Sequence, residues 1–215
     1  MKKKERKIPQ GAIRDKERTK LKLIQAVGEI IRTEGYTGLG VNKISYKAGV
    51  NKKLIYRYFE NVDNLVEVYI RGKNYWTTII EQLNFNELKK KWNDKAFSSL
   101  LNTQLDVLYD SEEIQHVLLW ELGEDSALMH EITEVRENFT NDLLQLTETT
   151  VASSAVDFRS LIALQLAGIY YLVLHGHFNK QHFCGLDFSK GEDRDRIKQT
   201  LIKINAWAFK EAKSR

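Results

Sequence analysis

Four side chains of metal-ligand type lie close together near the C-terminal end of the sequence: His175, His177, His182 and Cys184. Histidine and cysteine are the usual ligands of zinc. However, His175 and His177 are two positions apart, so they point in different directions if a helix continues through them. No pair has the spacing of a known zinc motif. The spacing therefore favours histidines at a helix end, on a surface or an interface, and we predict no metal and no cofactor.

Cys184 is the only cysteine of the chain. No intrachain disulfide can form, which fits a reducing cytoplasm. Neither this cysteine nor any serine lies in a recognisable nucleophile motif. We therefore predict that the protein is not an enzyme.

A different chemistry is indicated between Val41 and Phe59, where the sequence is VNKISYKAGVNKKLIYRYF. This stretch predicts two short helices joined by a turn at Gly49, with Asn51 as the N-cap of the second helix. Apolar residues of the second helix point inward, which leaves its cations and tyrosines outside: Lys52, Lys53, Tyr56, Arg57 and Tyr58. Two tyrosines are poorly used on a bare solvated face. We interpret the pair as a helix-turn-helix whose second helix enters a DNA major groove.

The charge distribution supports a polyanionic partner at one end of the chain. Residues 1–60 contain 16 Lys/Arg and 6 Asp/Glu, whereas the remaining residues contain 17 and 23. A basic end on an acidic body is typical of a protein that touches nucleic acid with that end only. Residues 1–15 are predicted to be a basic flexible arm, either a solvated tail or a source of salt-sensitive phosphate contacts.

An all-α fold is predicted from the near absence of proline, since Pro9 is the only one. No apolar run follows the basic N-terminus, so no signal peptide is predicted. The run from Leu161 to Leu174 is shorter than the about 20 residues that a membrane span needs. We interpret this run as a buried or interface helix and predict no membrane association.

The elements that position these residues follow from apolar periodicity. Helices are predicted over about 16–34, 41–48, 51–58, 63–84, 94–109, 112–122, 126–149, 156–178 and 193–212. Asn61 or Asp63 should cap the fourth helix. Gly72 within it would mark either a bend or close packing. The last helix is expected to bury Leu201 and Trp207.

The run from Arg18 to Val66 resembles the DNA-binding domain of the TetR (tetracycline-repressor) family of bacterial transcription regulators. The matching features are the first-helix pattern, Gly35-Tyr36, Ile44, Ala48-Gly49-Val50, Tyr56, Tyr58-Phe59 and Leu65. The resemblance implies a three-helix DNA-binding domain over residues 16–62 and a helical effector-binding and dimerisation domain over residues 63–215. It implies no catalysis.

The resemblance also implies roles for single residues. Asn42, Lys52, Lys53 and Tyr56 would face base edges, and Tyr58 would contact a phosphate. Three positions depart from the family pattern: Gly40-Val41 replaces a capping Thr, Leu54 replaces a Thr or Ser, and Val62 replaces a Lys. The candidates for further DNA contacts are Lys43, Lys47, Asn51, Arg57 and the N-terminal arm.

The predicted helix over 156–178 is apolar nearly all round, so it must be covered on every side. A second copy of the chain is the simplest cover on the outside. With the last helix it would form a four-helix bundle across a two-fold axis, as the resemblance also implies. A homodimer of this kind predicts a palindromic double-stranded operator.

Aromatic and apolar side chains of the C-terminal domain are candidates to line a pocket for a small apolar or aromatic effector, although each alone is better explained as core. They are Tyr75, Trp76, Phe97, Leu101, Trp120, Phe139, Tyr170 and Tyr171. The sequence thus predicts a cytoplasmic homodimeric repressor that an effector releases from its operator. The alternative is a DNA-binding organiser or protein-partner adaptor with no such pocket. A cavity of several hundred Å³ lined by these aromatic side chains would favour the first, and a filled core the second.

Overall fold

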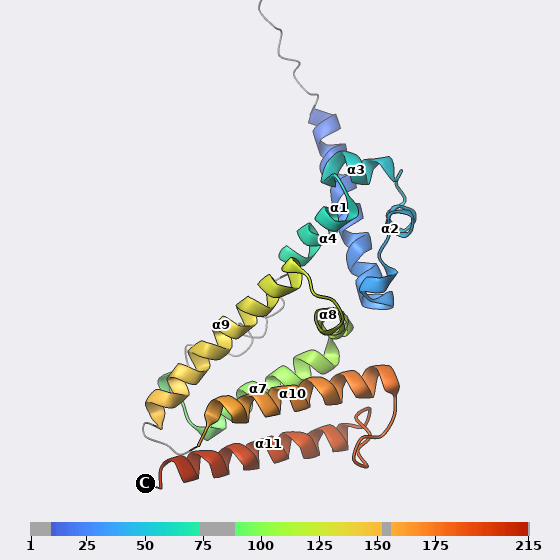
Figure 1. The fold of residues 1–215 in the computed structure, drawn as a ribbon. Coiled ribbons are helices and arrows are strands. Elements are labelled where there is room, and N and C mark those ends of the chain that lie inside the picture. The colour runs from blue at the N-terminus through green and yellow to red at the C-terminus, as the bar shows by residue number, and fades with distance from the viewer. Residues whose placement is uncertain (1–9, 74–88, 152–155, 215) are drawn as a thin grey trace, which may run out of the picture. The chain divides into compact units, whose positions relative to one another are not determined.

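The structure is a computed structural model that describes residues 10–73, 89–151 and 156–214. Tyr75 and Trp76 lie outside these ranges. The regular elements are helical, as predicted, and Figure 1 shows their order. They are α1 (Gln10–Glu34), a 3₁₀ turn (Tyr36–Gly38), α2 (Val41–Ala48), α3 (Lys53–Phe59), α4 (Val62–Arg71), α7 (Asp94–Asp110), α8 (Glu112–Gly123), α9 (Ala127–Thr150), α10 (Phe158–Leu174), a π-helical turn (His175–Asn179) and α11 (Gly191–Ala212).

The chain divides into two compact units. The first contains α1 to α4 together with His116–Trp120 of α8, and the second contains the remaining helical segments. Each unit has a core of its own, and each is described by itself below.

The first unit forms around one face of α1. Leu23, Val27, Ile30 and Ile31 recur at three- and four-residue spacing and are fully buried. Each of the three following helices adds at least one fully buried side chain to this core: Ile44, Ile55 and Leu65. Together, these contacts fix the angle between α2 and α3.

Two positions of the first unit require glycine for steric reasons. Gly49 ends α2 at φ 64°, a left-handed conformation that side chains disfavour, and this makes the tight turn toward α3. Gly28 faces Tyr69, and a Cβ added at Gly28 would overlap the tyrosine ring and its hydroxyl. A side chain at position 28 would therefore displace the buried Tyr69 ring.

Several predicted boundaries need correction. The first helix begins at Gln10, within the predicted arm. The third begins at Lys53 and not Asn51, because the Asn51 side chain accepts a hydrogen bond from the Lys53 backbone N–H at 2.9 Å. The predicted fourth helix was too long, since α4 ends at Arg71 with Gly72 as its C-cap. Its predicted cap is confirmed, because Asn61 accepts from the Asn64 N–H at 2.7 Å.

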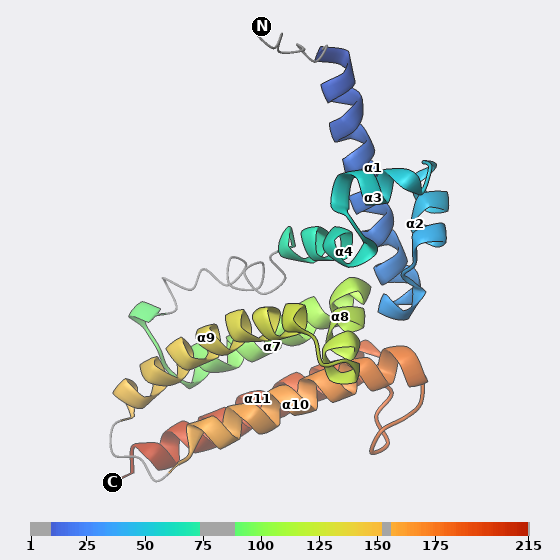
Figure 2. The same ribbon diagram turned by 45° about the horizontal axis from the view of Figure 1, so that its top comes forward.

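The second unit is built on α7, which packs against α10 and α11. The last two helices run side by side, as Figures 1 and 2 both show. The centre of the second unit is an aromatic cluster. The ring centroid of Phe97 lies 5.8 Å from that of Phe209 and 6.5 Å from that of Phe158. A buried polar chain crosses the same three helices: Gln165 donates to Asn205 at 2.8 Å, and Asn205 donates to Ser98 at 3.1 Å.

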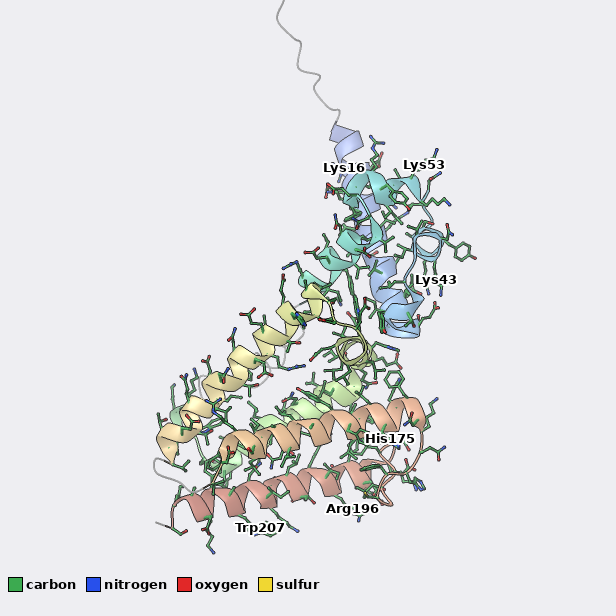
Figure 3. The ribbon with its side chains drawn as sticks, in the orientation of Figure 1. Lys16, Lys43, Lys53, His175, Arg196 and Trp207 are labelled. Carbon is green, nitrogen blue, oxygen red and sulfur yellow. The ribbon has the colours of Figure 1, made fainter. Side chains whose placement is uncertain are left out.

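The outer side of α10 is apolar and exposed, whereas the exposed side of α11 is polar apart from Trp207. Leu164 and Tyr171 on α10 are 74% and 50% exposed, and Trp207 on α11 is 67% exposed. The prediction that Trp207 is buried was wrong for the single chain, because this side chain lies on the outer face of α11 (Figure 3). Within the described ranges, Phe158–Asn179 is the one helical stretch that is long and apolar enough to cross a membrane, by length and composition alone.

Candidate functional site

The exposed face of α2 and α3 carries the predicted DNA-contacting side chains. Ile44, Ser45 and Ala48 of α2 are buried, as are Ile55 and Phe59 of α3, and the opposite side of each helix is exposed. Figure 3 shows Lys43 and Lys53 on this unit. The exposed side chains are Asn42, Lys43, Tyr46, Lys47, Lys52, Lys53, Tyr56 and Arg57. Positive charge, an amide and tyrosines on one short helix pair are suited to phosphates and base edges.

Two of the residues that are predicted to contact bases form a hydrogen bond with each other. The Lys52 ammonium donates to the Asn42 side-chain oxygen at 3.3 Å, so one side chain from each helix meets above the turn. Tyr56 is 53% exposed on the same face of α3. Asn51 is used differently, because its oxygen caps α3 through the bond to the Lys53 N–H. Its direct DNA contact remains a prediction.

Tyr58 is half-buried beside two cations. The Lys16 ammonium and the Arg57 guanidinium each lie 5.8 Å from the centre of its ring. Both are within the range of cation–π attraction. One cation from α1 and one from α3 thus lie beside the Tyr58 ring, which suits the predicted phosphate contact.

Lys43 and Lys47 are already engaged by acidic side chains of α1. Lys43 forms an ion pair with Glu34, and the Lys47 ammonium lies 2.9 Å from a Glu29 carboxylate oxygen. The hydrogen bond from Lys43 holds the pKa of Glu34 below its usual value. Exposed ion pairs of this kind contribute at most about 1 kcal/mol. A phosphate can therefore replace either carboxylate at low cost.

Sequence reasoning overlooked Tyr46, which is 88% exposed on α2. A signal was available, because Tyr46 is four residues after Asn42 and so lies on the same helix face. An aromatic side chain this exposed, one turn from a predicted base contact, adds a candidate to the DNA-facing surface.

The candidate effector residues do not gather in one place. Phe97 and Leu101 are fully buried in the aromatic core. Trp120 stacks on Tyr36 within the first unit, at 5.3 Å between ring centroids. Tyr171 lies on the exposed face of α10.

Of the described candidates, Phe139 lines a cavity. That cavity holds about 20 Å³, and its walls come from α7, α9 and α10: Leu100, Gln104, Arg136, Phe139, Thr140, Leu143, Ile162 and Leu166. Tyr170 lies next to it, because its hydroxyl accepts from Gln104 at 2.8 Å. Burial raises the pKa of Tyr170 to about 12. The described walls thus combine apolar side chains with a few converging polar groups.

The histidine and cysteine cluster is dispersed. His175 packs against the rings of Tyr171 and Phe183 at 5.5 and 5.6 Å between centroids. The Nε2 of His182 lies 3.7 Å from an Asp187 carboxylate oxygen. Cys184 sits exposed at the tip of a tight turn, between Phe183 and Leu186, whose backbones exchange two hydrogen bonds of 3.0 Å. In the ranges 10–73, 89–151 and 156–214, no group of three or more such ligands is placed to hold a metal.

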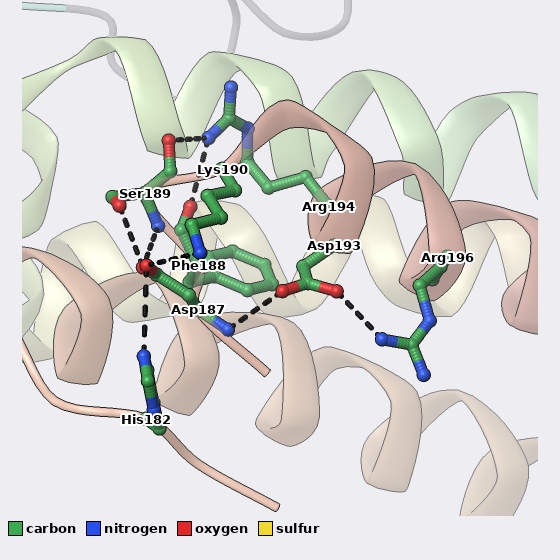
Figure 4. A network of polar contacts seen from close by, with 8 residues as sticks. All are labelled: His182, Asp187, Phe188, Ser189, Lys190, Asp193, Arg194 and Arg196. Atoms are coloured by element: carbon green, nitrogen blue, oxygen red, sulfur yellow. Dashed lines mark hydrogen bonds and ion pairs between the residues drawn. The ribbon is translucent and has the colours of Figure 1, made fainter. Parts of the chain in front are cut away.

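The loop before α11 is instead organised by two carboxylates (Figure 4). Asp193 accepts from the Asp187 backbone N–H at 2.9 Å, and Asp187 accepts from the Ser189 hydroxyl at 2.6 Å. These hydrogen bonds hold the pKa of both aspartates below the usual value. Arg194 closes the arrangement by donating to the Phe188 and Ser189 carbonyls. The network fixes where α11 begins.

The geometry of the first unit has counterparts among known proteins. The model of the bacterial regulatory proteins of the tetR family matches residues 23–69, which span α2, α3 and most of the helices that hold them. A TetR-family transcription regulator from Marinobacter aquaeolei is 18% identical, with a TM-score of 0.58, over 89% of this chain and 97% of that chain. Residues 23–69 therefore form a DNA-binding domain of the tetR family.

Other similar structures extend the likeness over the second unit. FadR of Bacillus subtilis, solved with stearoyl-CoA, has a TM-score of 0.61 at 20% identity, over 86% of this chain and 96% of that chain. RolR, solved with resorcinol, has a TM-score of 0.51 at 14% identity, over 94% and 97%. At these identities the likeness establishes the fold. A comparison with curated protein sequences gave no significant match.

The protein therefore combines an N-terminal helix-turn-helix of the tetR family of bacterial regulatory proteins with a helical C-terminal part. The family is non-enzymatic. The residues on α2 and α3 described above are its candidate DNA-facing surface.

Proposed function

We propose that this regulator is a cytoplasmic homodimeric repressor that holds a palindromic operator and is released from it by a small-molecule effector. The observation that carries the DNA-binding part is the exposed set on α3, with Lys52 joined to Asn42 and Tyr56 beside them. These side chains can donate to and stack on base edges in a major groove.

The dimer is supported by the apolar outer face of α10 and by the exposed Trp207 on α11. Only 28% of the most apolar window of Phe158–Asn179 is buried inside the single chain. Leu164, Tyr171 and Trp207 are exposed on these helices. A second copy related by a two-fold axis would cover this face, and it would set two α3 helices about 34–36 Å apart along DNA.

Control by an effector is supported by two of the similar structures. FadR was solved in complex with stearoyl-CoA, and RolR was solved in complex with resorcinol. An effector acts only through its difference in affinity for the DNA-competent and released states. We place its site at the cavity between α7, α9 and α10, where Phe139 and Leu143 meet polar groups.

One observation favours the alternative of an organiser or adaptor without a pocket. The described cavity holds about 20 Å³, against the several hundred Å³ of ordinary ligand sites. Binding of an effector here thus requires α9 to move away from α7 and α10.

Selection of bound DNA from a random pool tests the DNA-binding part. We expect a palindrome with half-sites one helical turn apart. Recovery of sequences without two-fold symmetry would overturn the homodimer model, and recovery of no common sequence would overturn the proposal of a specific operator.

A further inference from the structure

The wall of the cavity between α7, α9 and α10 contains an arginine, which a purely apolar pocket does not need. Arg136 on α9 has only 13% of its side chain exposed, and its partner Glu121 on α8 has 17%. The guanidinium donates to both carboxylate oxygens, at 2.8 and 2.6 Å. It also lies 5.8 Å from the centre of the Tyr170 ring.

Such a pair contributes little net stability. Taking two charges out of water costs about as much as their attraction returns, and apolar replacements of buried ion pairs are often neutral or stabilising. The Arg136–Glu121 pair is thus poorly explained by folding alone. A guanidinium fork is, however, well shaped to hold a carboxylate or a phosphate.

The apolar side of α9 next to Arg136 is incompletely covered. Ile132, Phe139 and Leu146 follow the same helix face and are only half-buried, and Val135 is 49% exposed. This stripe passes the arginine and continues into the cavity wall at Leu143. A helix with a half-buried apolar face gains free energy from any apolar chain laid against it.

We propose that the effector of this regulator is an amphiphile with an apolar chain and an anionic head, and that the head displaces Glu121 from Arg136. The proposal rests on the effector control proposed above and names the ligand class of that same site. The apolar chain of the amphiphile occupies the half-buried side of α9 and enlarges the cavity, which at about 20 Å³ has room for about one water molecule. The anionic head replaces the Glu121 carboxylate on the Arg136 guanidinium, whose two donor nitrogens are already held in position.

The position of Glu121 links this exchange to the regulator's output. Glu121 directly follows His116–Trp120, the segment of α8 that belongs to the first unit. Release of Glu121 frees the C-terminal end of α8, immediately beside Trp120 and its stack on Tyr36.

The test compares amphiphiles of one chain length that differ only in the head. Dodecanoate and dodecanoyl-CoA carry carboxylate and phosphate anions, dodecanol is neutral, and dodecyltrimethylammonium is cationic. Binding to the full chain is measured by calorimetry without DNA, below micelle-forming concentrations, and release of the selected operator is measured by fluorescence anisotropy. We expect at least one anionic probe to bind about tenfold or more tightly than the other two head types, a difference of about 1.4 kcal/mol. Comparing dodecanoate with dodecanoyl-CoA shows whether the site prefers a carboxylate or a phosphate head.

Variants assign the preference to Arg136. Arg136→Met should remove it, and Glu121→Gln should strengthen anion binding several-fold because the competing charge is gone. The double variant Arg136→Met/Glu121→Met replaces the whole pair and should keep the fold while losing the preference. Arg159→Gln is the matched control, since Arg159 pairs with Glu148 on the surface with 54% of its side chain exposed.

The outcomes separate the two proposals. If all head types bind and release DNA equally, or if the preference survives in both Arg136 variants, the anion assignment is overturned while effector control stands. If no amphiphile binds, the anion assignment is overturned, and effector control must then be tested with ligands of other classes. If anions bind with the expected preference but the operator is not released, the site is supported and effector control by it is refuted.

Discussion

The outer faces of α3 and α10 both expose aromatic side chains, but they differ in charge. On α3, Tyr56 is flanked by Lys52, Lys53 and Arg57. On α10, no charged residue occurs between Arg159 and His175, and Leu164 and Tyr171 are accompanied by small residues. A tyrosine among cations suits nucleic acid, whereas a tyrosine among aliphatic and small side chains suits a packed protein surface. The surroundings of an exposed aromatic residue therefore decide which partner it indicates.

The largest effect is expected at Leu164. Leu164→Glu would place an unpaired charge in the centre of the proposed dimer face, and it would do so twice per dimer. Burial of an unpaired charge costs about 3–5 kcal/mol, so we expect a monomer in sedimentation equilibrium and loss of operator binding. Val135→Glu, at another exposed apolar position, is the control. A Leu164→Glu protein that stays dimeric would show that the partner surface lies elsewhere.

The buried Tyr170 of α10 should make the stability of the protein depend on pH. The pKa of Tyr170 is raised from 10.0 to about 12 by burial, so its contribution to stability is complete below pH 10 and is lost as the pH rises toward 12. We expect the free energy of unfolding to fall by about 2 kcal/mol over this interval through Tyr170. Urea unfolding between pH 9 and 12 measures it, and Tyr170→Phe should flatten the profile.

On α3 the expected losses are smaller and concern specificity. Tyr56→Ala and Lys52→Ala should each cost about 1–3 kcal/mol of operator binding. A gel-shift comparison with a scrambled operator of the same length separates loss of base contacts from loss of charge. Unchanged selectivity in both variants would show that Tyr56 and Lys52 do not contact the bases of the operator.

The smallest effect should come from the ion pairs that α1 makes with α2. Glu29→Gln would free Lys47 for a phosphate, which should steepen the salt dependence of DNA binding by about one counterion. The unfolding free energy should change by less than about 1 kcal/mol. Glu67→Gln on α4, which releases Arg71, changes the net charge equally and is the control. Equal salt slopes in the two variants would mean that Lys47 does not contact DNA.

Much of the first unit could be predicted from the sequence because its signals are local. The bounds of α2 agree with the prediction, Gly35 and Gly49 stand where α1 and α2 end, and Asn61 caps α4. The start of α3 was missed by two residues because a side-chain cap can lie outside the first helical turn. The pairing of Lys47 with Glu29 was also missed, because it joins side chains eighteen positions apart on different helices.

The second unit was predicted less well, for a physical reason. Apolar periodicity identifies which side of a helix avoids water, but not what covers that side. Phe97 and Leu101 were candidates for a pocket and are core, while Trp207 was assigned to the core and is exposed. The Glu121–Arg136 pair combines residues of two helices, and nothing in either segment alone marks it.

The tight turn at Cys184 has a practical consequence. The chain carries one thiol, and the turn holds it exposed next to Gly185 on a loop whose far end is fixed by Asp187 and Asp193. A maleimide spin label would therefore attach at a single defined point without any substitution. In a two-fold assembly it would report one intermolecular distance, so that the geometry of the pair could be followed by pulsed electron resonance as ligands and DNA are added.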